Sequence, residues 1–256
     1  MASGYHEDLA YIHDVGFGHF ARNAAPGLLE LLRKRQVVRG LVVDLGCGSG
    51  IWARELCNAG YEVLGVDLSE AMLAIARQRV PEAEFRQGSL LSAKLPPCVA
   101  VTSIGECFNF LFDRRNTTRR LLELFRRVHD ALVPGGLFIF DVAGPGRVPG
   151  PGTQRKYFEG EDWAVLVAAE EDRQAKLLTR RITSFRKVGK LYRRDEEIHA
   201  LRLYTPLELA QQLRDCGFRV NVLRGYGPMR FAPGYFGLLA RKAYRKGEGS
   251  KRWRRS

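Results

Sequence analysis

Residues 42–52 read VVDLGCGSGIW, a hydrophobic run that breaks into three glycines within five residues. The run is short, apolar and β-branched, which is typical of a buried parallel strand. The glycines indicate a tight turn in which bare backbone approaches a ligand. The residues that follow predict a helix that ends at Gly60, because glycine suits the residue just past a helix. The stretch therefore predicts a strand, a glycine turn and a helix in succession.

The same alternation of strand and helix continues through the first 145 residues. Four more strands are predicted, at residues 61–69, 84–91, 98–106 and 136–144. Helices are predicted at residues 5–35, 70–80 and 117–136, the last ended by Pro-Gly-Gly. Strands that alternate with helices favour an α/β fold with a doubly wound, mostly parallel sheet covered on both faces.

The pattern changes after Gly144. A loop rich in glycine and proline leads to three long predicted strands within residues 163–204, then a helix at 205–218 and a closing hairpin from residues 219–227 and 235–243. We therefore expect seven strands with a C-terminal antiparallel hairpin, plus a small antiparallel β insert. Residues 1–242 form a single domain in this interpretation. The insert, residues 150–204, would be a substrate-binding lid, and residues 243–256 a basic, flexible tail.

Composition bears on the cellular location and the binding partners of the protein. The net charge is +13, of which residues 241–256 contribute +7. Such a tail suits either polyanion binding or simple solubility. The five cysteines form no CxxC pair, the first residues do not resemble a secretory signal, and no apolar run suits a membrane span. We expect a cytoplasmic protein with no membrane partner and no metal site.

The glycine turn does not match the two common phosphate-binding loops. A dinucleotide fingerprint requires a third glycine at position 51, where the chain has Ile51. A P-loop requires a lysine that is absent here. What remains is an acid two residues before the first of three alternating glycines, in the order Asp44, Gly46, Gly48 and Gly50.

This arrangement resembles the class I S-adenosylmethionine-dependent methyltransferases, which have a Rossmann-like fold. VVDLGCGSG resembles the first motif of that family, and GVDLSEAMLAIAR resembles the second. IGECFNFLFD and LVPGGLFIFD extend the resemblance, which covers residues 10 to 242 in the correct order. The resemblance implies that the cofactor is S-adenosylmethionine, which carries no phosphate.

The chemistry of that cofactor suits the residues present. The amides after Gly50 would bind its carboxylate, Asp44 its ammonium group, and Asp67 both ribose hydroxyls. Asp67 would equally suit a dinucleotide ribose. Ser89 stands where the family often has an acid that contacts the adenine amine. The expected cofactor-binding residues are Asp44, Gly46, Cys47, Gly48, Gly50, Asp67, Leu68, Met72, Gly88, Ser89, Leu90, Ile104 and Gly105.

The reaction itself demands little acid–base chemistry. Methyl transfer from a sulfonium is an in-line displacement, so positioning and desolvation contribute most of the catalysis. A base is needed only if the acceptor must lose a proton. The catalytic candidates are Glu106, which could also be a helix N-terminal acid, and His199, which could be structural. The substrate-binding candidates are Tyr11, His13, Asn109 and Arg202.

Three kinds of function are compatible with the sequence. The favoured one is methyl transfer to an O or N atom of a small molecule. A nucleic-acid methyltransferase is a second possibility, because the insert and tail are basic. The Asn/Asp-Pro-Pro-aromatic motif of nucleic-acid amino-methylating enzymes is absent, however. The LPPC stretch, residues 95–98, leads into the fourth strand in an expected surface turn, so Cys98 would lie at the wrong end of the sheet for the Pro-Cys nucleophile of cytosine-C5 enzymes. A cofactor-binding protein without methyl transfer is the third. The sequence does not indicate the oligomeric state.

Overall fold

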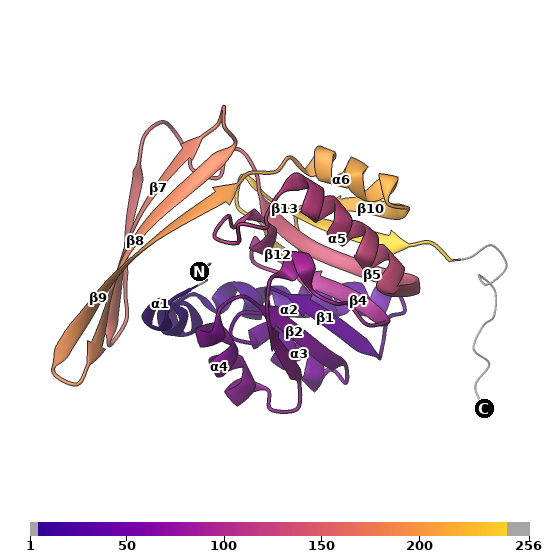
Figure 1. Cartoon of the computed structure of the whole chain (residues 1–256), viewed down its shortest axis with the longest axis horizontal. Coiled ribbons are helices and arrows are strands. Elements are labelled where there is room, and N and C mark those ends of the chain that lie inside the picture. The colour runs from indigo at the N-terminus through magenta and orange to yellow at the C-terminus, as the bar shows by residue number, and fades with distance from the viewer. Residues whose placement is uncertain (1–4, 245–256) are drawn as a thin grey trace.

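The computed structural model describes residues 5–244, which form the expected α/β architecture (Figure 1). Seven strands make the central sheet in the order β10-β13-β5-β4-β1-β2-β3. All are parallel except β13, which runs against both its neighbours. The sheet confirms the predicted fold class, including the C-terminal hairpin. The strands are β1 Leu41–Leu45, β2 Glu62–Asp67, β3 Glu84–Gln87, β4 Cys98–Ser103, β5 Leu132–Ala143, β10 Phe218–Leu223 and β13 Tyr235–Lys242.

Helices cover both faces of this sheet. They are α2 His19–Lys34, α3 Ile51–Asn58, α4 Glu70–Arg79, α5 Thr118–Ala131 and α6 Pro206–Asp215. Successive residues of β1 point to opposite faces, as the pleat requires. Val42 packs with residues of α2 and α3, whereas Val43 belongs to the cluster that includes α5 and α6. The fully apolar strand in the sequence is thus explained by burial on both sides.

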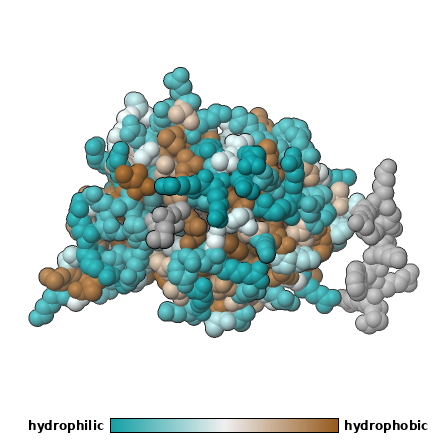
Figure 2. Space-filling view, in the orientation of Figure 1, coloured by the Kyte–Doolittle hydropathy of each residue, from teal (hydrophilic) through white to brown (hydrophobic). Residues whose placement is uncertain are grey.

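The insert is a separate antiparallel sheet of four strands beside the domain (Figure 1). They are β6 Gln154–Glu159, β7 Trp163–Asp172, β8 Leu177–Val188 and β9 Leu191–Arg202. Only three were predicted, because β6 is an exposed edge strand without an apolar alternation. Exposed hydrophobic side chains, including Val188 and Leu191, gather at the tip of the β8–β9 hairpin (Figure 2).

The N-terminal segment lies between the insert and the glycine turn. Its predicted continuous helix is instead α1 Glu7–Ile12, a π-helical turn over His13–Phe17, and then α2. Asp8 pairs with Arg186 of β8 at 3.0 Å, while the hydroxyl of Ser49, in the glycine turn, donates to Asp14 at 2.6 Å. The segment therefore links the insert to the cofactor side of the domain.

Other local predictions need correction. The helix predicted to Gly136 ends at Ala131, because Leu132 already pairs with β4 as part of β5. The third strand ends at Gln87 and a short 3-10 turn, Leu90–Ser92, follows it. Cys98 is buried at the start of β4 rather than in a surface turn. A two-stranded ribbon of β11 Gly225–Tyr226 and β12 Met229–Arg230 interrupts the closing hairpin.

Two further expectations concern membrane-spanning segments and the C-terminal tail. None of the helices within residues 5–244 combines the length and hydrophobicity that a bilayer crossing requires. The predicted basic tail falls almost entirely outside the described residues, which end at Tyr244.

Candidate functional site

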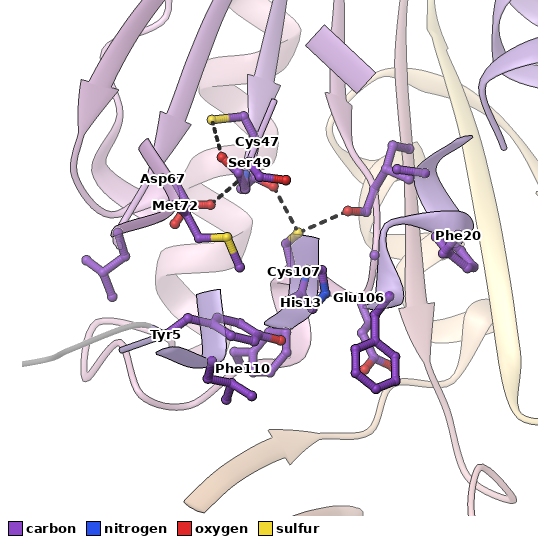
Figure 3. Close-up of a pocket in the computed structure, with 18 of the residues that line it drawn as sticks. Tyr5, His13, Phe20, Cys47, Ser49, Asp67, Met72, Glu106, Cys107 and Phe110 are labelled. Carbon is purple, nitrogen blue, oxygen red and sulfur yellow. Dashed lines mark hydrogen bonds between the residues drawn. The ribbon is translucent and has the colours of Figure 1, made fainter. Parts of the chain in front are cut away.

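A cavity of about 470 Å³ opens at the carboxyl ends of β1, β2 and β4. This is the position where open α/β sheets bind ligands. Figure 3 shows Asp67 and Met72 on one side of it and Glu106 and Phe20 on the other. The sheet supplies one wall, the N-terminal segment another, and β6, β7 and β8 of the insert the third. Its volume lies within the range of small-molecule and cofactor sites.

The glycine turn brings backbone to the cavity surface. Gly46, Gly48 and Gly50 have φ angles of 77°, 52° and 76°, which favour glycine. A Cβ on Gly46 would lie 2.6 Å from the sulfur of Cys107, whereas one on Gly48 would meet only open space. Glycine is thus needed for close packing at one position and leaves room for a ligand at the other.

Asp67 closes β2 and faces this turn. Its carboxylate accepts hydrogen bonds from the amides of Gly48 and Ser69, both at 2.9 Å. Burial raises the pKa of Asp67, and these amides oppose that shift. The carboxylate still has lone pairs free for the vicinal hydroxyls of a ribose, so the arrangement fits a nucleoside cofactor.

Most of the expected cofactor residues surround the same cavity. Those that line it are Asp44, Gly46, Cys47, Gly48, Asp67, Leu68, Met72, Ser89, Leu90, Ile104 and Gly105. Gly50 and Gly88 do not. A Cβ on Gly50 would lie 3.1 Å from that of Ala76, and the amide of Gly88 donates to the carbonyl of Asp67 at 2.8 Å, so both shape the site from behind it.

Asp44 is buried at the end of β1. The hydroxyl of Thr102 donates to it at 2.7 Å and in turn accepts from the indole of Trp52 at 3.1 Å. Burial raises the pKa of Asp44 to about 7, against the effect of Thr102, and the neighbouring Asp67 and Asp141 raise it further. A ligand cation at this position would stabilise the ionised carboxylate.

Asp113 is a cavity residue that the sequence analysis missed. Its carboxylate accepts the hydroxyl proton of Ser89, whose oxygen also accepts from the amide of Leu91. The hydrogen of Ser89 is therefore committed, and the loop after β4 places a carboxylate beside Ser89 in the cavity lining.

A buried carboxylate fixes the turn that carries Glu106. Gly105 and Glu106 have φ angles of 97° and 56°, and both amides donate to one oxygen of Asp141, at 2.8 and 2.7 Å. The hydroxyls of Tyr226 and Tyr235 also donate to Asp141. Burial raises the pKa of Asp141 to about 6, although these four donors stabilise its charge. A non-glycine residue in left-handed conformation is held here by its surroundings.

The side chain of Glu106 lines the cavity, and only one of its two carboxylate oxygens has a hydrogen-bond partner. One oxygen forms a close ion pair with Arg180 of β8. The other oxygen, Oε2, is buried without a hydrogen-bond partner and lies 4.0 Å from Nε of Arg147. Buried acceptors in folded proteins are nearly always satisfied, so this oxygen is a candidate contact for a bound ligand.

His13 lies in the π-helical turn at the cavity wall. Burial lowers its pKa to about 4, so the ring is neutral at physiological pH. Its Nδ1 is buried without a partner, and its ring packs edge-on against Tyr5 at 5.2 Å. Tyr5 lines the cavity too, and burial raises the pKa of its hydroxyl.

Two of the substrate-binding candidates, Asn109 and Arg202, lie outside the cavity lining. The amide group of Asn109, within the 3-10 turn Cys107–Asn109, donates to the carbonyls of Ala143 and Arg202 at 2.7 and 2.6 Å and accepts from the amide of Ala143. It joins the loop after β4 to β5 and β9. Arg202 likewise lies outside the cavity lining.

Tyr11 and His199 also lie outside the cavity lining. Tyr11 donates to Asp162 at 3.0 Å and stacks under the guanidinium of Arg186, away from the cavity lining. His199 is buried in β9, bonds Glu197 at 2.8 Å through Nε2 and lies outside the cavity lining.

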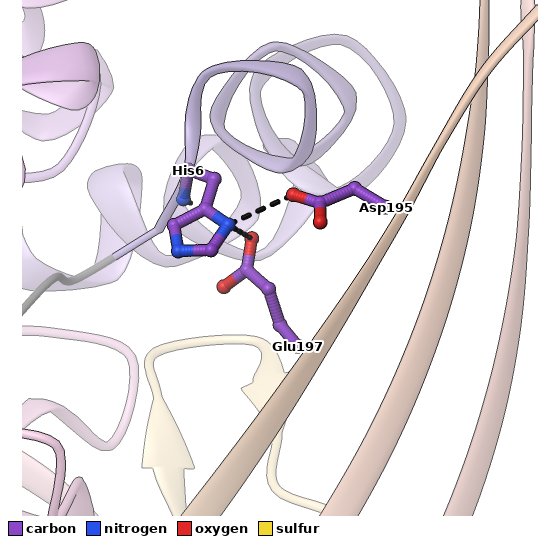
Figure 4. Close-up of side chains that lie close together, drawn as sticks. All are labelled: His6, Asp195 and Glu197. Carbon is purple, nitrogen blue, oxygen red and sulfur yellow. Dashed lines mark hydrogen bonds and ion pairs between the residues drawn. The ribbon is translucent and has the colours of Figure 1, made fainter.

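Glu197 also belongs to a latch that joins the N-terminal segment to β9 (Figure 4). The Nδ1 atom of His6 lies 2.8 Å from an oxygen of Asp195 and 3.8 Å from Oε1 of Glu197. The backbone amide of His6 donates to the same Glu197 oxygen at 3.1 Å. Hydrogen bonds account for the geometry of the latch, so we assign no metal to it.

Comparisons with known proteins agree with this geometry. The family described as a methyltransferase domain matches residues 42–136. YqeM, a Bacillus subtilis protein named as a methyltransferase, is 26% identical over 193 residues, covering 72% of this chain and 75% of its own. A Streptomyces venezuelae enzyme, dTDP-3-amino-3,4,6-trideoxy-alpha-D-glucopyranose N,N-dimethyltransferase, is 24% identical over 87% of this chain and 93% of its own.

A solved structure shows the same fold. The S-adenosylmethionine-dependent methyltransferase from Clostridium acetobutylicum superposes with a TM-score of 0.79 at 19% identity, covering 92% of this chain and 98% of its own. The glycine turn, Asp67 and the family match together show that this chain is an enzyme of the class I S-adenosylmethionine-dependent methyltransferase family.

Proposed function

We propose that this methyltransferase transfers the methyl group to the nitrogen of a small-molecule amine. The observation that carries the proposal is Oε2 of Glu106, which is buried at the cavity surface without a hydrogen-bond partner. A carboxylate oxygen accepts an N–H hydrogen bond and stabilises the positive charge that develops on an attacked nitrogen. His13, neutral and with a free ring nitrogen, is the second polar contact for the acceptor.

The electron balance of this reaction is simple. S-adenosylmethionine, when bound, would supply the methyl group on a sulfonium sulfur. The lone pair of a neutral amine would form the new N–C bond, and the electron pair of the broken C–S bond would remain on the sulfur as a neutral thioether. The methylated nitrogen then releases its proton to Glu106 or to water. Glu106 orients the amine and stabilises the product charge, so it need not be a strong base.

In this proposal one half of the cavity, the cofactor half, would hold S-adenosylmethionine. Asp67 accepts from the ribose hydroxyls, Asp44 faces the ammonium group, and Leu68 and Met72 contact the adenine ring. Asp113, held by Ser89, accepts from the adenine amine in place of the acid that the family often has at the end of β3. The contacts in the protein support each role, because every one of these side chains lines the cavity.

Residues 150–204 would act as a lid over the acceptor, within a single domain of residues 1–242. Phe158, Val165, Val167 and Ile182 of the insert line the cavity and exclude water from it. Several arginines of the insert are already paired with acids, including Arg180 and Arg186, which favours a small molecule over a nucleic acid. The relative that methylates an amino sugar supports the same choice. We place the enzyme in the cytoplasm because its cysteines are free thiols.

The proposal is tested with matched acceptors. Purified protein and S-adenosylmethionine are incubated with amino sugars and other small amines, each beside the analogue with hydroxyl in place of the amine. Production of S-adenosylhomocysteine with the amines, and N-methylation found by mass spectrometry, is the expected result. Turnover of the hydroxyl analogues alone would overturn the assignment to nitrogen.

A further inference from the structure

We infer that the methyl acceptor carries an anionic group, a carboxylate or a phosphonate, close to its nitrogen, and that Arg147 binds this group. The inference rests on the proposed function, since it takes Glu106 as the residue that meets the amine. It adds a second subsite and a charge requirement that the acceptor must satisfy.

The charges at the acceptor end of the cavity do not balance. Two guanidinium groups, Arg147 and Arg180, face the single carboxylate of Glu106. Tyr5 and His13 add no charge at neutral pH, because burial raises the pKa of the tyrosine hydroxyl and lowers that of the imidazole to about 4. An excess positive charge in a partly buried site favours an anionic ligand group.

The nearby carboxylates are already committed elsewhere. Asp141 lies behind the turn and receives four hydrogen bonds from amides and tyrosine hydroxyls. Glu171 accepts from the amides of Gly146 and Val148, at 2.7 and 2.8 Å, and pairs with Arg173 at 3.6 Å. These two amides flank Arg147. Glu171 therefore positions the loop that presents Arg147 to the cavity.

Arg147 itself is only partly satisfied. Its guanidinium stacks on the ring of Tyr235, with 5.3 Å from the carbon to the ring centroid, and its side chain is 30% exposed. Its Nε is buried without a hydrogen-bond partner. Stacking fixes the plane of the guanidinium and leaves its N–H edge for a planar anion.

The separation of the two unpartnered atoms sets the spacing of the ligand groups. Nε of Arg147 and Oε2 of Glu106 are 4.0 Å apart, too far for a direct hydrogen bond. A ligand that donates to Glu106 and accepts from Arg147 would carry its nitrogen and oxygen about 3 to 4 Å apart if the two bonds run side by side. An α-amino acid has this spacing, because two carbon atoms separate its nitrogen from a carboxylate oxygen, and a β-amino acid, with three carbon atoms between them, can also adopt it.

Apolar side chains line the same cavity. Phe17, Phe158, Val165 and Ile182 line the cavity from the N-terminal segment and the insert. They favour an acceptor whose amine and anion are attached to a hydrophobic body. Phenylalanine, phenylalaninol and phenethylamine share such a body and an amine, and differ only in having a carboxylate, a hydroxyl or hydrogen beside it.

The test is calorimetric titration of these three probes into protein saturated with S-adenosylhomocysteine. We expect phenylalanine to bind about tenfold more tightly than phenethylamine, with phenylalaninol between them. Arg147→Gln should reduce that ratio to about twofold. The matched variant Arg155→Gln, on the exposed edge strand β6, should retain the full ratio.

Three results would overturn the inference: equal or tighter binding of phenethylamine, an unchanged ratio in Arg147→Gln, or no binding of phenylalanine to the saturated protein. The titration does not depend on methyl transfer. Failure of this inference is therefore distinguished from failure of the proposed function, which would show as no N-methylation of any amine.

Discussion

The two halves of the cavity are built in different ways. The cofactor half lies on strand ends and one glycine turn, and its key carboxylate, Asp67, is held by the backbone amides of Gly48 and Ser69. The acceptor half is assembled from the N-terminal segment, the loop after β4 and the insert, and Glu106 meets Arg180 across 74 residues of sequence. Unpartnered atoms of Glu106, His13 and Arg147 all lie in the acceptor half. Strand ends and backbone amides hold the acids of the first half, whereas the second half contains these three polar side-chain atoms without a hydrogen-bond partner.

The largest expected effect separates chemistry from cofactor binding. Glu106→Gln keeps the shape of the side chain but removes its charge, so we expect kcat/KM for an amine acceptor to fall about 100-fold. Affinity for S-adenosylhomocysteine should change less than about threefold, because the cofactor half has its own contacts. Steady-state kinetics and calorimetry measure the two quantities, and Glu208→Gln on the exposed surface of α6 is the control. An equal loss of both would show that the halves are not independent.

The reverse experiment alters the cofactor half. Asp67→Ala removes the acceptor for the ribose and leaves the amide of Gly48 without its bond. Affinity for S-adenosylhomocysteine should fall about 30-fold, as expected for the loss of hydrogen bonds to a charged group. Asp130→Ala, at a position 84% exposed, should bind as the unaltered protein does. An affinity within threefold of the original would refute the ribose assignment.

A pH dependence distinguishes Asp44 from the acceptor residues. Its pKa of about 7 means that a proton must leave before it meets the cofactor ammonium. Affinity for S-adenosylhomocysteine should therefore weaken roughly tenfold from pH 7 to pH 5.5, with proton release during binding. Calorimetry in buffers of different ionisation enthalpy detects the released proton. A profile in Asp44→Asn as steep as in the unaltered protein would assign the proton to another group.

The smallest effect is expected at the latch between His6 and β9. The hydrogen bond that Nδ1 of His6 donates to Asp195 raises the pKa of His6, against the effect of burial. A histidine whose pKa is higher in the folded state stabilises the fold at pH values below its pKa in the unfolded state. This contribution is lost as the pH rises through its pKa in the folded state. Both side chains are more than a third exposed, at 45% and 38%, so His6→Ala should cost less than about 1 kcal/mol. Thermal unfolding measures it at acidic and basic pH. A larger cost at basic pH than at acidic pH would contradict the latch.

The sequence predicts the cofactor half far better than the acceptor half. Asp44 and Asp67 follow strands whose apolar runs are visible, and a glycine turn has few alternatives, so their positions could be expected. Arg180 and Arg147 belong to segments whose placement depends on how the insert packs, and no spacing in the chain brings them to Glu106. The place of Asn109 outside the cavity could not be predicted for the same reason, since its hydrogen bonds to the distant backbone of Ala143 and Arg202 leave no local pattern.

The most direct test of the account is to titrate the protein with S-adenosylhomocysteine and, separately, with NAD. Both contain an adenosine ribose that Asp67 could bind, but only NAD requires a phosphate loop. We predict a single saturable site for S-adenosylhomocysteine and no binding of NAD at the same concentrations. Binding of NAD without S-adenosylhomocysteine would contradict the assignment of the glycine turn and with it the methyltransferase mechanism.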